Sequence, residues 1–117
     1  MTTIKLDIDG DKKLFKAVVK RIKIVVFTLR FFPTIMTVHK TKNGYHIYLE
    51  IEKNLTDREI CLVQCLCGSD LYRELCNYKR IKARHKNWNV LFSVKKGLNG
   101  KEKSKERYLY SCVLNFN

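Results

Sequence analysis

The sequence has 117 residues, of which 45% are hydrophobic and 11% aromatic, and this composition predicts one folded domain over residues 1–117. Lysine and arginine number 24 against 11 aspartates and glutamates, a net charge of +13. Residues 78–107 alone hold 11 basic and 2 acidic residues. Such a cluster favours a polyanionic partner, most often nucleic acid, although a lysine-rich surface can also serve only to keep a small protein in solution.

Membrane insertion and secretion are both disfavoured by the sequence. The most apolar run, residues 24–32, is shorter than a membrane span and contains Arg30, and no apolar signal-peptide block is found near the first residues. The cysteines number five, and four of them lie within residues 61–76, which is not typical of a secreted disulfide framework. We therefore expect a cytoplasmic protein with reduced thiols and no membrane partner.

The clustered cysteines do not predict a zinc site. The spacing of Cys61, Cys65, Cys67 and Cys76 matches no usual zinc finger or knuckle, and two cysteines separated by one residue point apart on a helix. No zinc is expected, and these thiols are expected to pack as small hydrophobic side chains.

The first predicted element is a strand over residues 3–10. Its apolar residues alternate with polar ones, so that Asp7 and Asp9 share one face. Two carboxylates on one strand face repel each other, so either a solvated edge tolerates them or a cation belongs there. A helix with helically spaced apolar residues and a lysine-rich opposite side follows over residues 11–32 and ends before Pro33.

The second predicted unit begins with a β-hairpin over residues 34–51 that turns at Asn43-Gly44. The next segment is helical, with a capping box of Thr56 and Glu59 at its start. Gly68-Ser69-Asp70 either interrupts it or begins a second helix. The remaining predictions are the helical segment 54–82, a strand at 88–97, a basic loop at 98–106 and a last strand at 107–116.

This order of elements predicts an α+β fold. A βαββαβ sequence with an extra C-terminal strand suggests a ferredoxin-like or RRM-like sandwich, in which helices cover one face of an antiparallel sheet. In that topology the first and third strands are central neighbours. Asp7, Asp9 and His46 are then expected to converge on the open face of the sheet.

The converging side chains suit a divalent metal ion. Carboxylate oxygens are ligands for Mg²⁺ or Mn²⁺, and substrate phosphates complete the coordination shell. The structural alternative is a solvated acidic strand and a histidine that makes a local hydrogen bond. Tyr48 lies on the same predicted face and is a candidate for stacking on a base, whereas Trp88 is expected in the core.

"LDID" on a first strand, followed by a helix and a hairpin reading "TKNGYHIYLE", resembles the archaeo-eukaryotic primase superfamily, including plasmid and viral primase-polymerases. The resemblance implies an RRM-like catalytic core that performs template-directed nucleotidyl transfer with Mg²⁺ or Mn²⁺. Its implied partners are single-stranded or primed nucleic acid, a nucleoside triphosphate and other replication proteins, in the host cytoplasm if the source is viral.

The resemblance also implies residue roles. Asp7 and Asp9 would be catalytic metal ligands and His46 would contact the incoming nucleotide, next to a hairpin formed by residues 41–44. The nucleotide-binding residues implied or predicted in this way are Lys42, Asn43, Gly44, His46 and Tyr48.

The primase pattern includes a third carboxylate, which has no counterpart in the predicted strand 88–97. Asn89 is the nearest polar residue in that strand. Asp70 is the candidate third ligand, with helix capping as its alternative role. Two other functions stay open. The chain could be a catalytically inactive nucleic-acid-binding module, or a rolling-circle endonuclease using Tyr78 and Lys82, although the two-histidine motif of that class is absent.

The basic residues between the second helical segment and the following strand are predicted to hold a phosphate backbone. They are Lys79, Arg80, Lys82, Arg84, Lys86, Lys95 and Lys96.

Overall fold

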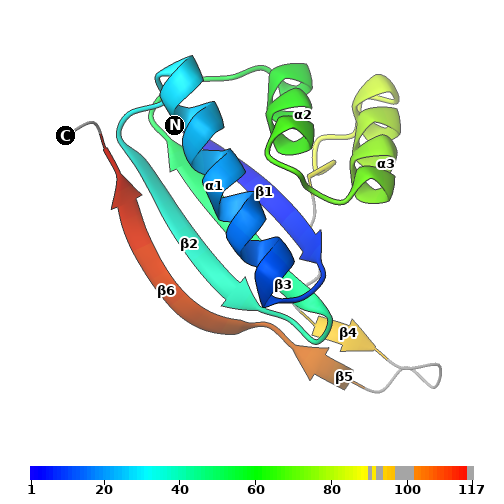
Figure 1. Cartoon of the computed structure of the whole chain (residues 1–117). Coiled ribbons are helices and arrows are strands. Elements are labelled where there is room, and N and C mark those ends of the chain that lie inside the picture. Colours follow the sequence, from blue (N-terminus) through cyan, green and yellow to red (C-terminus); the bar gives the residue numbers. More distant parts are fainter. Residues whose placement is uncertain (90, 92–93, 97–101, 116–117) are drawn as a thin grey trace.

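The computed structural model describes residues 1–89, 91, 94–96 and 102–115, and it confirms an α+β fold (Figure 1). These residues form a four-stranded antiparallel sheet, a two-stranded ribbon and three helices. The elements are β1 (Thr2–Asp9), α1 (Lys12–Leu29), β2 (Thr34–Lys40), β3 (Gly44–Ile51), α2 (Asp57–Leu66), α3 (Leu71–Lys82), β4 (Val94–Lys96), β5 (Glu102–Lys105) and β6 (Arg107–Leu114).

The main sheet has the strand order β1-β3-β2-β6, and α1 lies across one of its faces (Figure 1). The alternation in β1 buries Ile4, Leu6 and Ile8, which form one core with Val18 and Ile22 of α1. The polar residues of β1 consequently lie on the opposite face. The predicted hairpin is confirmed, because β2 and β3 pair on either side of the turn at residues 41–43.

The place of the last strands differs from the arrangement expected for a ferredoxin-like sheet. β1 is a neighbour of β3, as predicted, but it is the first strand of the order rather than a central one. Of the predicted strand 88–97 only Val94–Lys96 is a strand, β4, while residues 88, 89 and 91 have no regular structure and residues 90, 92–93 and 97 lie outside the described residues. The prediction of a loop over residues 98–106 is wrong at Glu102–Lys105, which form β5 and pair with β4. The predicted C-terminal strand is confirmed as β6, which extends the sheet beside β2.

The outer edge of β1 is bonded to the α2–α3 segment. The backbone N–H of Lys5 donates to Oε1 of Gln64 at 3.0 Å, and the N–H of Asp7 donates to the Ser69 hydroxyl at 3.0 Å. The N–H of Asp70 donates to the Asp7 carbonyl at 2.8 Å. Side chains and a turn therefore satisfy backbone groups that a neighbouring strand would otherwise pair.

A buried carboxylate organises this edge. Glu74 is 2% exposed and accepts hydrogen bonds from the Gln64 amide at 2.7 Å, the Ser69 hydroxyl at 2.7 Å and the Asn77 amide at 3.0 Å. The guanidinium of Arg73 forms an ion pair with it. The buried charge is thus both paired and fully surrounded by donors, which is the condition under which a buried carboxylate is tolerated.

The helix boundaries follow their local signals. Thr56 and Glu59 form the predicted capping box at the start of α2. Asp70 caps α3, because its Oδ2 accepts a hydrogen bond from the Arg73 N–H at 3.2 Å; the predicted capping role is confirmed, and it uses one of the two carboxylate oxygens. The segment 54–82 is therefore two helices, and α1 extends to Leu29 despite its β-branched second half.

The described cysteines are all free thiols, and two of them, Cys61 and Cys67, are buried. Burial raises the pKa of the Cys67 thiol to about 12 and that of Cys61 to about 11. No helix among the described residues has both the length and the apolar composition of a membrane span.

The buried thiol of Cys67 predicts an alkaline loss of stability. Its pKa is raised above the unfolded value of 9.0, so the folded state holds the proton more tightly and the free energy of unfolding falls as pH rises from about 9 towards 12. In urea unfolding, the fall between about pH 8 and pH 10 is expected to be about 1 kcal/mol smaller in Cys67→Ala than in the wild type. An equal fall in both proteins would contradict this assignment.

Candidate metal and nucleotide site

Asp7 and His46 face each other across β1 and β3. They are direct partners in the strand register, and Nε2 of His46 lies 3.6 Å from Oδ1 of Asp7. The two residues differ in exposure, because the His46 side chain is 3% exposed and that of Asp7 is 34% exposed. The structure thus brings this predicted pair together, with His46 behind Asp7 rather than at the surface.

Glu106, which directly precedes β6, bonds the ring nitrogen of His46 that does not face Asp7. Nδ1 of His46 lies 2.7 Å from Oε2 of Glu106, and the Tyr48 hydroxyl donates to the same oxygen at 3.1 Å. Burial, and next the neighbouring Glu106 carboxylate, raise the pKa of the Tyr48 phenol above its ordinary value. Tyr48 is therefore a neutral donor to Glu106, and its hydroxyl is already engaged.

His39 of β2 completes the cluster. Its Nδ1 is 3.4 Å from Oε1 of Glu106, and its ring packs edge-on against those of Tyr48 and Tyr108. Sequence reasoning missed both His39 and Glu106. The hairpin register, which pairs His39 with His46, was a usable signal for the first. Glu106 was assigned to a basic loop, and nothing local indicated that it would reach His46.

The order Glu106–His46–Asp7 is an arrangement that orients a carboxylate. Nδ1 of His46 is within hydrogen-bond distance of Glu106, which fixes the ring orientation from the buried side, whereas Nε2 faces Asp7 at 3.6 Å, beyond hydrogen-bond distance. His46 can donate towards Glu106 and attract the Asp7 carboxylate at the same time only when both ring nitrogens carry a proton. The only one of the three with a substantially exposed side chain is Asp7, at 34% against 14% for Glu106. Of these three side chains, that of Asp7 is therefore the most accessible to a ligand.

Asp7 also lines a hollow of about 240 Å³ between the end of β1 and the start of α3. Asp70 and Arg80, both exposed, line the same hollow, together with the highly exposed ring of Tyr72. Two carboxylates, an aromatic ring and two guanidinium groups, that of Arg80 and that of Arg73, which is paired with Glu74, therefore line one space. Asp9 does not line it; this residue is exposed at the end of β1, opposite Gly44.

The donor set of the hollow suits a magnesium-type ion that shares a phosphate ligand. Among the described residues no group of three or more histidine, cysteine, aspartate or glutamate side chains could hold a metal ion by itself. Mg²⁺ is commonly bound through one or two carboxylates, with phosphates and water in the other positions. Asp7 and Asp70 meet this lower requirement.

One residue of the predicted nucleotide-binding hairpin, Gly44, is required by the packing of β1 against β3. Lys42 and Asn43 are exposed in the turn, whereas Gly44 is buried. A Cβ atom on Gly44 would lie 1.8 Å from the Ile8 carbonyl oxygen, so β1 and β3 can approach only around a glycine. The Asn43 carbonyl accepts a hydrogen bond from the Gly10 N–H at 3.0 Å, which ties the turn to the end of β1.

The predicted phosphate-binding residues are exposed where their side chains are described. They are Lys79, Arg80 and Lys82 in the last turns of α3, and Arg84 and Lys86 after it. Lys95 and Lys96 belong to β4, and their side chains lie outside the described part of the structure. Trp88 is buried, as predicted.

Comparison of the chain with protein-family models, with curated proteins and with solved structures finds no match.

Proposed function

We propose that this protein binds a nucleoside triphosphate with Mg²⁺ or Mn²⁺ at the hollow lined by Asp7 and Asp70, and that it acts on single-stranded or primed nucleic acid as a small primase-polymerase-like replication protein. The observation that carries the proposal is that Asp7, Asp70 and Arg80 line one hollow, while the buried His46, held by Glu106, faces Asp7 from behind. In this proposal the βαββ part of the chain is an RRM-like core.

Each residue of the hollow has a role that its chemistry supports. Asp7 and Asp70 would hold the ion through carboxylate oxygens, and Arg80, which bonds the Asn77 side chain at 3.1 Å, has further guanidinium donors for a phosphate. Tyr72 offers an exposed ring for stacking on a base. A bound divalent ion would neutralise the negative charge of the triphosphate.

A non-catalytic nucleic-acid-binding module is the second candidate function. Two observations favour it: His46 is buried behind Asp7, and Asp9 points to solvent outside the hollow. In this case the Glu106–His46–Asp7 chain stabilises the sheet face, and no nucleotide is incorporated. The two candidates differ in whether the protein incorporates nucleotides.

Asp7→Asn is expected to weaken Mn²⁺-dependent nucleoside triphosphate binding about tenfold or more, because it removes a charged ligand while keeping the side-chain shape. Asp9→Asn is the matched control, since it makes the same change two residues away on the same strand face. The control is expected to stay within about threefold of the wild type. Titration calorimetry with and without Mn²⁺ gives both affinities.

Incorporation of labelled nucleotides on primed and unprimed single-stranded templates separates the two candidate functions. Metal-dependent product that is lost in Asp7→Asn would support nucleotidyl transfer. Metal-dependent nucleotide binding without product would contradict nucleotidyl transfer and support the non-catalytic module. Equal affinities of wild type and Asp7→Asn would contradict the assignment of the hollow itself.

A further inference from the structure

A second strongly basic part of the chain lies outside the stretch that sequence analysis singled out. Residues 12–49 contain nine lysines and arginines and no acidic residue. Most of these charges belong to α1, which lies on the face of the sheet opposite Asp7. A polyanion bound on α1 would therefore not meet the acidic side chains of the hollow.

Four of the six exposed lysines and arginines of α1 are aligned. Buried Val18, Ile22 and Val26 define the side of the helix that faces the sheet. At about 100° per residue, consistent with 3.6 residues per turn, one flank of the helix, turned roughly 80–160° from that side, presents a row that we call the α1 ridge. The α1 ridge consists of Lys12, Lys16, Lys20, Lys23, Phe27 and Arg30, all of them exposed.

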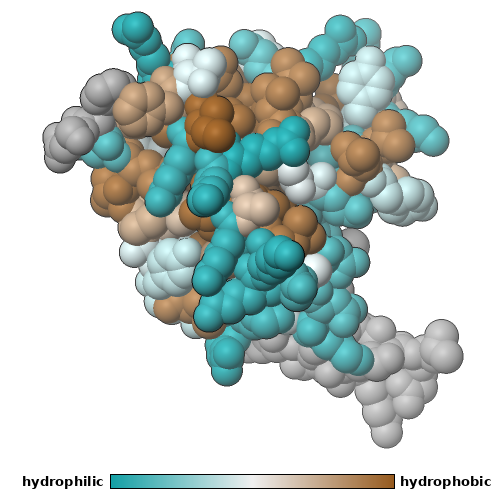
Figure 2. All heavy atoms as spheres, in the orientation of Figure 1, coloured by the Kyte–Doolittle hydropathy of each residue, from teal (hydrophilic) through white to brown (hydrophobic). Residues whose placement is uncertain are grey.

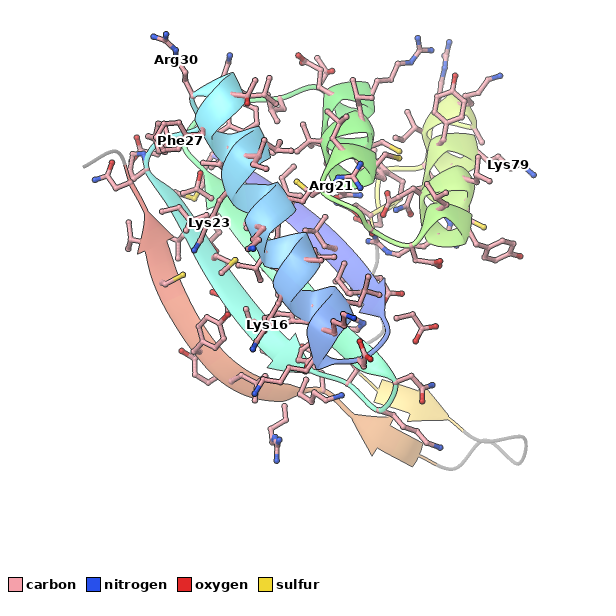
Figure 3. The ribbon with its side chains drawn as sticks, in the orientation of Figure 1. Lys16, Arg21, Lys23, Phe27, Arg30 and Lys79 are labelled. Carbon is pink, nitrogen blue, oxygen red and sulfur yellow. The ribbon has the colours of Figure 1, made fainter. Side chains whose placement is uncertain are left out.

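The α1 ridge runs nearly the whole length of the helix. Lys12, Lys16 and Lys20 follow each other at about 6 Å along the axis, roughly one lysine per turn. Figure 3 shows Lys16, Lys23 and Phe27 along the flank of α1 on the side of β2 and β6, with Arg30 at its end. In Figure 2 hydrophilic side chains gather over α1. The ion pairs found among the described residues include none of these cations.

An aromatic hollow lies at the far end of the α1 ridge. Phe27, Phe32, Lys23, Val26 and Val113 are among the side chains around a space of about 220 Å³. The rings of Phe27 and Phe32 pack edge-on with centroids 5.3 Å apart, and Phe27 is 51% exposed. A flat apolar ring next to a lysine suits an unstacked nucleobase, which a double helix does not present.

We infer that the α1 ridge is the main binding surface for single-stranded nucleic acid, with its lysines on the phosphates and Phe27 against a base. This inference rests on the proposed function for the class of ligand, and it moves the principal surface away from α3. Two basic residues of α3 are already engaged, because Arg80 is assigned to the triphosphate at the hollow and Lys82 lies over the ring of Tyr78. Lysine contacts carry charge but little base selectivity, so binding is expected to be independent of sequence.

The test compares two triple variants that each remove three exposed positive charges. Lys16→Gln/Lys20→Gln/Lys23→Gln alters the α1 ridge, and Lys79→Gln/Lys82→Gln/Lys86→Gln alters α3 and the residues after it. Fluorescence anisotropy with labelled oligo(dT) gives the affinity across a series of salt concentrations. The ridge variant is expected to bind about tenfold or more weakly, with the salt slope smaller by about two. The α3 variant is expected to stay within about threefold.

A second pair of variants tests the aromatic hollow. Phe27→Ala is expected to weaken oligo(dT) binding about fivefold or more without changing the salt slope, because it removes stacking and no charge. Ile24→Ala is the control, since Ile24 is 65% exposed on the same helix but is not part of the ridge. Circular dichroism establishes that every variant is folded.

The outcomes separate this inference from the proposed function. An equal or greater loss in the α3 variant would overturn the inference and leave nucleic-acid binding intact. Tighter binding to duplex DNA or to anionic lipid vesicles than to oligo(dT) would also overturn it. Loss in the ridge variant, with Asp7→Asn unchanged in nucleotide binding, would support the ridge while contradicting the hollow.

Discussion

Gly44→Ala is expected to lower the free energy of unfolding by about 2–4 kcal/mol, one of the two largest effects of a single substitution that the structure predicts. The added Cβ would overlap the Ile8 carbonyl oxygen, 1.8 Å away, and backbone atoms cannot move aside as a flexible side chain can. Relief of the overlap requires β1 and β3 to separate at the pair Asp9–Gly44. Urea unfolding followed by circular dichroism measures the loss.

Asn43→Ala is the matched control for this substitution. Asn43 is exposed, and its contact with Gly10 uses the backbone carbonyl, which alanine retains. The control is expected to stay within about 1 kcal/mol of the wild type. If Gly44→Ala were as stable as the wild type but failed to bind nucleotide, the role implied by the primase resemblance would replace the structural one.

Glu74→Ala is expected to destabilise the protein by about 3–5 kcal/mol. The substitution leaves the Gln64, Ser69 and Asn77 donors buried without their acceptor and leaves the Arg73 guanidinium without its ion pair. It also loosens the two side chains, from Gln64 and Ser69, that bond the edge of β1. The effect therefore reaches beyond α3 to the sheet.

The size of this effect is checked against two further variants in the same unfolding experiment. Glu50→Ala removes an exposed carboxylate from β3 and is expected to change the stability by less than about 0.5 kcal/mol. Glu74→Gln keeps the shape but turns an amide donor towards other donors, so an intermediate loss is expected. A Glu74→Ala loss no larger than that of Glu50→Ala would show that the buried network contributes nothing net.

Those parts of the fold that depend on local pattern were predictable. The alternation in residues 3–10 placed Asp7 on the face away from the core, and Asn43-Gly44 located the hairpin that sets His46 opposite it. Thr56 and Asp70 marked the starts of α2 and α3. In each case neighbouring residues suffice, because periodicity and capping act within a few positions of the chain.

Those parts that depend on contacts between distant segments were not predictable. The bond from Lys5 to Gln64 joins residues 59 positions apart, and without such bonds the outer edge of β1 would need a neighbouring strand to pair its backbone groups. Glu106 reaches His46 across 60 positions. Neither contact produces a periodic pattern in the sequence. The side-chain bonds to the edge of β1 and the bond between Glu106 and His46 are therefore visible only in the folded structure.

The position of β6 has a consequence for motion. Within the described residues β6 joins the main sheet only through β2, and most of its side chains are exposed, so its detachment requires less free energy than global unfolding. Glu106 directly precedes this strand, and detachment would withdraw it from His46. Local opening at the sheet edge and the orientation of Asp7 are thereby thermodynamically linked. A ligand that requires the anchored histidine would slow amide exchange throughout β6, on the side of the sheet far from the hollow.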